Sequence, residues 1–82
     1  MSEKLVKALY EGVVTIVFEK IDTKEIRIMP CTLNKDFHKQ TIEIKNLSAM
    51  DTIVCYALDK LAWRDVRINT IKDWYEGYPK EI

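Results

Sequence analysis

The pattern of hydrophobic and polar positions is clearest in residues 51–71. Ile53, Cys55 and Ala57 alternate with Val54, Tyr56 and Leu58, and a second alternating run covers residues 62–68 after a polar break at Asp59 and Lys60. Side chains in a strand point to opposite faces with a period of two. The segment therefore predicts two antiparallel strands joined by a short turn, the strongest hairpin in the chain.

Residues 12–20 form the run with the highest β propensity, because every residue from 13 to 18 is β-branched or aromatic. We expect Val14, Ile16 and Phe18 to face the core. The other face of this run is also largely apolar, which predicts a central strand or a strand covered by a helix.

Residues 26–33 are predicted to return as the next strand, with Ile26 and Ile28 facing the core. Pro30 has no N–H for a β-ladder, so it indicates an edge, a bulge or the end of that strand. A further short strand is predicted at residues 41–45, where polar and apolar side chains alternate again.

Both ends of the chain are predicted to contain helical pieces. Residues 2–10 begin with a good N-cap residue and an acid in the first turn, and their apolar residues recur at helical spacing; a frayed extended arm is the alternative. Residues 69–75 predict a short helix or 3₁₀ turn capped by Asn69 or Thr70.

Five or so short strands with helical ends in 82 residues favour a mainly β fold, a small, strongly bent barrel of the SH3-like kind. A sandwich usually needs about 100 residues. We expect one domain that covers residues 1–82, because the chain is too short for a second core.

The charge balance argues against a protein that holds nucleic acid by its overall field. Thirteen basic and thirteen acidic residues cancel, whereas strong non-specific DNA binding needs many phosphate contacts. No apolar run approaches the ~18 residues of a membrane span, and the first residues lack the apolar core of a signal peptide. We therefore expect a cytoplasmic protein without a membrane partner.

The two cysteines and the single histidine do not predict a metal or catalytic site. Cys31 and Cys55 lie in apolar strands without CxxC spacing, so reduced, buried thiols are favoured over a disulfide. His38 is flanked by Lys35 and Lys39, which is typical of a solvated loop residue. We expect no metal and no cofactor, and no motif of a known enzyme class is present.

Tryptophan and arginine side chains give one candidate site. Trp63 and Arg67 share a face of their predicted strand, which would suit base stacking beside a cation, and Arg64 and Arg27 could add charge. Arg64 and Arg67 point to opposite faces of a regular strand, so only a bulge or strong curvature would let both reach one ligand. The alternative is a tryptophan in the core with arginines in surface ion pairs.

Aromatic residues near the C-terminus give the other candidate site: Trp74, Tyr75 and Tyr78. They either close the open end of a small barrel or form the anchors of an exposed protein-binding surface, where buried aromatic side chains dominate the binding energy.

Three segments of the sequence resemble a family of small phage-encoded proteins described as SH3 β-barrel fold-containing, of unknown function. The segments read EGVVTIVFEK, IRIMPCTL and DTIVCYALDKLAWRDVRINTIKDW. They follow the family's order of a G-x-V-x-V-x-F-x-K strand, an M-x-C-T-L strand and an A-W-R-S-F-R-x-x-S-I strand. This sequence departs from the pattern at Asp65 and Val66, which replace Ser and Phe, and at Pro30. The resemblance implies an SH3-like barrel in a phage accessory protein of the host cytoplasm.

The last strand is also distantly similar to the end of WYL domains, SH3-like ligand sensors whose closing strand reads R-x-F-R-L-D-R-I. Asn69 and Thr70 replace the Asp and Arg of that pattern, which weakens the case for a nucleotide ligand.

The sequence thus predicts a non-catalytic module that docks on a host or phage protein. The alternative is a nucleic-acid or nucleotide binder in the Sm-like or WYL-like manner, which would use Trp63 and Arg67. Self-association through free strand edges would be compatible with either function.

Overall fold

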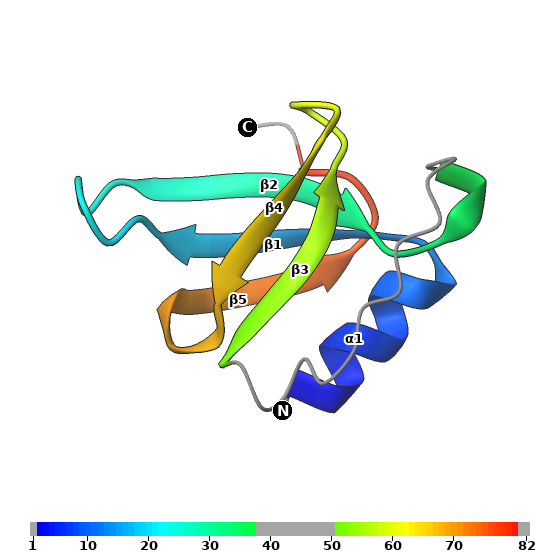
Figure 1. Cartoon of the computed structure of the whole chain (residues 1–82), viewed down its shortest axis with the longest axis horizontal. Coiled ribbons are helices and arrows are strands. Elements are labelled where there is room, and N and C mark those ends of the chain that lie inside the picture. Colours follow the sequence, from blue (N-terminus) through cyan, green and yellow to red (C-terminus); the bar gives the residue numbers. More distant parts are fainter. Residues whose placement is uncertain (1, 38–50, 81–82) are drawn as a thin grey trace.

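The computed structural model describes residues 2–37 and 51–80. One short helix precedes five antiparallel strands that form a single open sheet in the order β4-β3-β2-β1-β5 (Figure 1). The elements are α1 Ser2–Glu11, β1 Val13–Glu19, β2 Ile26–Thr32, β3 Thr52–Ala57, β4 Ala62–Arg67 and β5 Ile71–Glu76, with 3₁₀ turns η1 at Lys35–Phe37 and η3 at Ile68–Thr70. The prediction of a mainly β fold with an N-terminal helix is confirmed. The predicted strand at residues 41–45 and His38 lie outside the described residues.

The strand β1 is central, as its two apolar faces predict. It pairs with β2 on one side and with β5 on the other. Val14 and Ile16 are fully buried, and Phe18 packs against the core from its half-buried position. In Figure 1 the hairpin of β3 and β4 runs across β1, β2 and β5, and the core includes residues from α1 and from β1 to β4. The open sheet is therefore bent (Figure 1), with the β3–β4 hairpin and α1 contributing to one core.

The expected orientation of β2 is wrong. Met29 lies opposite Ile16 in the β1–β2 ladder and is 1% exposed, whereas Ile26 and Ile28 are 56% and 44% exposed. Directly opposite residues of antiparallel strands share a face. The register with β1 therefore assigns Met29 to the core and turns both isoleucines outward.

Pro30 does not end β2, which continues to Thr32. The Pro30 carbonyl accepts a hydrogen bond from the Leu58 N–H on the β3 side, and ladder pairing with β3 begins only at Cys31. The carbonyl and the nitrogen of one strand residue point to the same side. The missing N–H of Pro30 therefore faces Leu58 at the start of the β2–β3 pairing, and the β1–β2 ladder loses no hydrogen bond.

The helix α1 ends at the point where the sheet begins. The Gly12 N–H donates to the Ala8 carbonyl, and the Leu33 N–H donates to the Leu9 carbonyl at 2.9 Å. The buried Thr32 hydroxyl adds a 2.6 Å hydrogen bond to the Gly12 carbonyl. These contacts fix the last turn of the helix against the end of β2.

The predicted hairpin is confirmed as β3 and β4, but the predicted C-terminal helical turn is wrong for most of its length. Only Ile68–Thr70 form a 3₁₀ turn, and Ile71–Glu76 continue as the edge strand β5. The pairing of β5 with β1 joins segments far apart in the chain, and such pairing has no local sequence signal. Among the described residues, no helix is long and apolar enough to cross a membrane.

Candidate functional site

The arginines of β4 lie on opposite faces of a regular strand. The β3–β4 ladder runs without a register shift, with Cys55 opposite Arg64 and Thr52 opposite Arg67. The register shift of the sheet lies between β1 and β5 instead. Arg64 therefore shares the face of the buried Cys55, while Arg67 shares the outer face with Trp63. The structure does not bring Arg64 and Arg67 together, but it keeps Trp63 and Arg67 on one face, as the two-residue period predicts.

Trp63 is held on the sheet by its neighbour. The rings of Trp63 and Tyr56 meet edge to face, with centroids 5.5 Å apart and an interplanar angle of 72°. The same tryptophan is half-buried and packs against the core. Such edge-to-face contacts contribute about 0.5–1.5 kcal/mol beyond the buried area. The ring thus has a packing role.

Arg27 lies in β2 and binds elsewhere. Its guanidinium donates to a carboxylate oxygen of Asp59 at 2.8 Å, and Asp59 belongs to the turn between β3 and β4. This ion pair joins β2 to the hairpin. Arg27 is therefore engaged in a structural ion pair, and its strand β2 is separated from β4 by β3.

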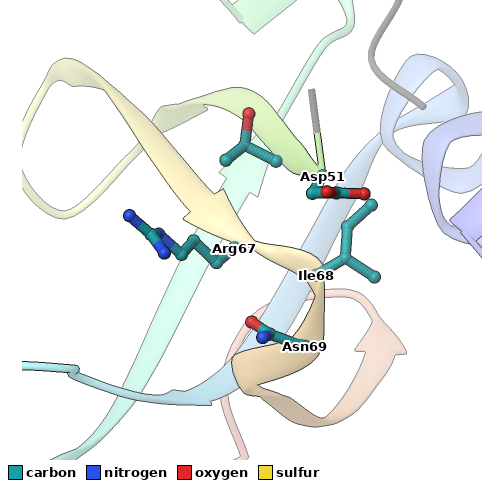
Figure 2. Close-up of a pocket in the computed structure, with 5 residues that line it drawn as sticks. Asp51, Arg67, Ile68 and Asn69 are labelled. Atoms are coloured by element: carbon teal, nitrogen blue, oxygen red, sulfur yellow. The ribbon is translucent and has the colours of Figure 1, made fainter. Parts of the chain in front are cut away.

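A pocket of about 630 Å³ lies where β3 begins and β4 ends, lined by Asp51, Thr52, Arg67, Ile68 and Asn69. The Ile68 N–H donates to the Asp51 carbonyl at 2.9 Å and closes the base of the hairpin. Figure 2 shows the Arg67 side chain extending away from Asp51 and Ile68. The opposite charges of Arg67 and Asp51 therefore do not converge on one bound molecule.

The C-terminal aromatic residues are divided between two faces. Trp74 lies opposite Ile16 and packs against the core, whereas Tyr75 lies opposite Thr15 on the outer face. Tyr78 is 60% exposed in the segment that follows β5. The Tyr75 hydroxyl accepts a hydrogen bond from the Lys80 N–H at 3.2 Å, so this segment folds back to Tyr75. Tyr75 therefore lies on the outer face and Tyr78 is exposed, whereas Trp74 packs against the core.

An apolar group on the outer face was missed by the sequence reasoning. Val17 lies opposite Ile28, and Ile26 follows on the same face of β2. Tyr75 is diagonal to Val17 across the β1–β5 pair. We call Val17, Ile26, Ile28 and Tyr75 the outer strip. The sequence contains a signal for this arrangement. One face of β2 carries Met29 and Cys31 and continues with Leu33, all of them apolar, whereas the face with Ile26 and Ile28 continues as Pro30 and Thr32. The more continuous apolar face is the one that packs in the core.

The two thiols are free and fully buried, as the sequence predicts. The Cys31 thiol donates a weak hydrogen bond to the Val14 carbonyl at 3.5 Å. A hydrogen bond with the Cys55 thiol, together with burial, raises the pKa of Cys31 far above its ordinary value. A thiol that stays protonated is a poor nucleophile. Within residues 2–37 and 51–80, no three His, Cys, Asp or Glu side chains are grouped to hold a metal ion.

Comparison of the chain with protein-family models, with curated proteins and with solved structures finds no match.

Proposed function

We propose that this protein is a small, non-catalytic binding module that docks on another protein through the outer strip. The observation that carries the proposal is the exposure of Ile26 and Ile28, at 56% and 44%, on the face that also presents Tyr75. Large aliphatic side chains on the solvent side of a sheet do not stabilise the monomer by burial. A contiguous apolar patch on a small protein is a recurrent sign of a protein interface.

The composition of the outer strip suits an interface. Tyrosine is enriched in interfaces because it offers a large apolar ring and a polar tip at a low entropic cost. Tyr78, which is more exposed than the strip itself, extends the aromatic surface along the segment that binds back to Tyr75. Of the predicted anchors, Tyr75 and Tyr78 remain in the proposal, and Trp74 acts through the core.

The resemblance of the sequence to small phage-encoded proteins supports two further parts of the proposal. We assign the bent five-stranded sheet to the SH3-like barrels, and we take the protein to be a phage accessory factor that works in the host cytoplasm. Its partner is then a host or phage protein.

Affinity capture from host lysate, with and without nuclease, tests the proposal. The bait is the wild-type chain, and the test variant carries Ile26→Ser, Ile28→Ser and Tyr78→Ala. The matched control is Leu61→Ser, because Leu61 is 73% exposed in the turn between β3 and β4. We expect one protein, insensitive to nuclease, to be retained by the wild type and by the control and to be lost by the test variant. Equal retention by all three baits would contradict the proposal.

Binding of nucleic acid or a nucleotide is the second candidate, and the placement of Trp63 and the exposed Arg67 on one face of β4 favours it. In this case the captured material disappears with nuclease. Arg67→Glu would then abolish binding of a labelled single strand, and the wild type would lose affinity steeply with salt. An affinity for the labelled strand that changes neither with Arg67→Glu nor with salt concentration would exclude this function.

A further inference from the structure

A cleft of about 510 Å³ runs along the free edge of β4, on a surface separate from the outer strip. One wall is the end of β1 and the turn after it, and the other is the last part of β4 with Thr70; the lining includes Phe18, Ile21, Asp65, Val66 and Arg67. Ile21 is 60% exposed, and Phe18 is half-buried. The cleft therefore combines apolar side chains with charged ones, which on the β1 side are Glu19, Lys20 and Asp22, beside the free edge of β4.

The hydrogen-bonding groups of β4 alternate between β3 and this cleft. The bond from the Ile68 N–H to the Asp51 carbonyl continues the register of the β3–β4 ladder and identifies the pairs that exchange hydrogen bonds. By alternation, the main-chain groups of Arg64 and Val66 point to β3. Those of Trp63, Asp65 and Arg67 then point away from β3, to the side where the described chain has no further strand.

Side chains confirm this assignment at two positions. The Trp63 carbonyl accepts a hydrogen bond from the Arg64 guanidinium at 3.1 Å, and the Arg67 carbonyl accepts one from the Thr70 hydroxyl at 2.6 Å. Both carbonyls are thus outside the β3–β4 ladder. Asp65, between them, presents an N–H and a carbonyl to the cleft without such a side-chain bond, and these two groups match one residue of an added strand.

The charges of β4 define what that strand would carry. Asp65 and Arg67 are exposed, lie two residues apart on one face, and form no ion pair within the described part of the chain. Val66, between them, faces the core side of the cleft beside Phe18. We propose that the cleft binds an extended peptide segment of another protein, antiparallel to β4, with the order acidic, apolar, basic from its N-terminus. The acidic residue lies opposite Arg67, the apolar residue opposite Val66, and the basic residue opposite Asp65, since opposite charges across strands attract.

Two synthetic peptides of equal composition test the order of charges. One contains Thr-Glu-Val-Lys-Thr and the other Thr-Lys-Val-Glu-Thr, both with blocked ends, and each is titrated into the isotope-labelled full chain by NMR. We expect the first peptide to bind at least tenfold more tightly and to slow hydrogen exchange at the Asp65 amide. In the variant Asp65→Lys with Arg67→Glu, the preference for the two peptides is expected to reverse.

The outcomes separate this inference from the proposed function. Ile28→Ser with Tyr78→Ala alters the outer strip and its extension, and should leave the peptide affinities unchanged. Equal binding of the two peptides, binding of neither, or protection of amides outside β4 would overturn the proposal. Protection of the Asp65 amide without peptide, together with a doubling of the 9.7 kDa mass, would assign the edge to a second copy of the chain and overturn it as well.

Discussion

Two neighbouring residues of β2 are expected to respond very differently to the same substitution. Met29 is 1% exposed and Ile28 is 44% exposed, although they are adjacent in sequence and both hydrophobic. We choose Ile28→Thr and Met29→Thr, because threonine is favoured in strands and leaves the β propensity largely unchanged at both positions. Burial then decides the difference between the two variants.

The magnitude follows from what each side chain buries. Met29→Thr leaves about two fewer apolar heavy atoms in the core, at about 0.8 kcal/mol per methylene-sized group, which gives a loss of about 1.6 kcal/mol. A cavity and a buried hydroxyl add to this loss, so we expect at least about 3 kcal/mol in total. Ile28→Thr acts at a half-exposed position and should cost about 0.5–1 kcal/mol. Domains are stable by about 0.05–0.15 kcal/mol per residue, or roughly 4–12 kcal/mol for 82 residues, so Met29→Thr removes a large part of the total.

Urea unfolding followed by far-ultraviolet circular dichroism measures both free energies of unfolding. In thermal melts, where 1 kcal/mol corresponds to about 4–8 °C for a domain of this size, Met29→Thr should lower Tm by more than about 12 °C and Ile28→Thr by less than about 8 °C. If Ile28→Thr is as destabilising as Met29→Thr, the β1–β2 register that places Met29 opposite Ile16 is incorrect.

Three further substitutions test individual contacts. Thr32→Val removes a fully buried hydroxyl that contacts the Leu9 carbonyl of α1 at 3.1 Å and the Gly12 carbonyl at 2.6 Å, and that accepts from the Asn34 N–H at 3.0 Å. The free energy of unfolding should therefore fall by about 1–3 kcal/mol in urea titrations, and a smaller loss would show that these hydrogen bonds do not stabilise the fold. The pKa of Cys31 is raised in the folded state, so at alkaline pH the unfolded chain loses this proton first. The free energy of unfolding is therefore highest below the ordinary thiol pKa and falls above it by up to about 1.4 kcal/mol per pH unit. Cys31→Ala should reduce this slope, and an equal pH dependence of the free energy of unfolding in both proteins would contradict the prediction. A double-mutant cycle on Arg27 and Asp59 should give a coupling of about 0.2–1 kcal/mol that decreases with salt, and a coupling that persists in high salt would contradict a surface ion pair.

The sequence predicts local elements well and long-range pairing poorly. The β3–β4 hairpin is specified by its own alternation, and the two strands are neighbours in the chain. The phase of β2 is ambiguous because both faces carry apolar residues, Ile26 and Ile28 on one and Met29 and Cys31 on the other, and only the register with β1 decides between them. For β5, Asn69 and Thr70 resemble the cap of a helix and so favour a helical turn. The strand forms because it pairs with β1, near the other end of the sequence, where Trp74 lies opposite Ile16.

The candidate sites show the same division. That Trp63 and Arg67 share a face follows from the period of a strand alone. The engagement of Arg27 by Asp59 depends on how the turn after β3 reaches β2, and no pattern in either segment encodes this contact. The outer strip required the register of β2, and the cleft beside β4 required the bend of the whole sheet.

The position of β1 has a consequence for the synthesis of the chain. The Thr15 hydroxyl of β1 donates to the Gly77 carbonyl, 62 residues further along the chain. A ribosome therefore releases α1 and four of the strands before the partner for the second side of β1 exists. Until β5 emerges, one edge of the most apolar strand stays unpaired, and such an edge can pair with other nascent chains. Completion of the sheet thus waits until residues 71–77 have left the ribosome, and until then the open edge of β1 is exposed to aggregation.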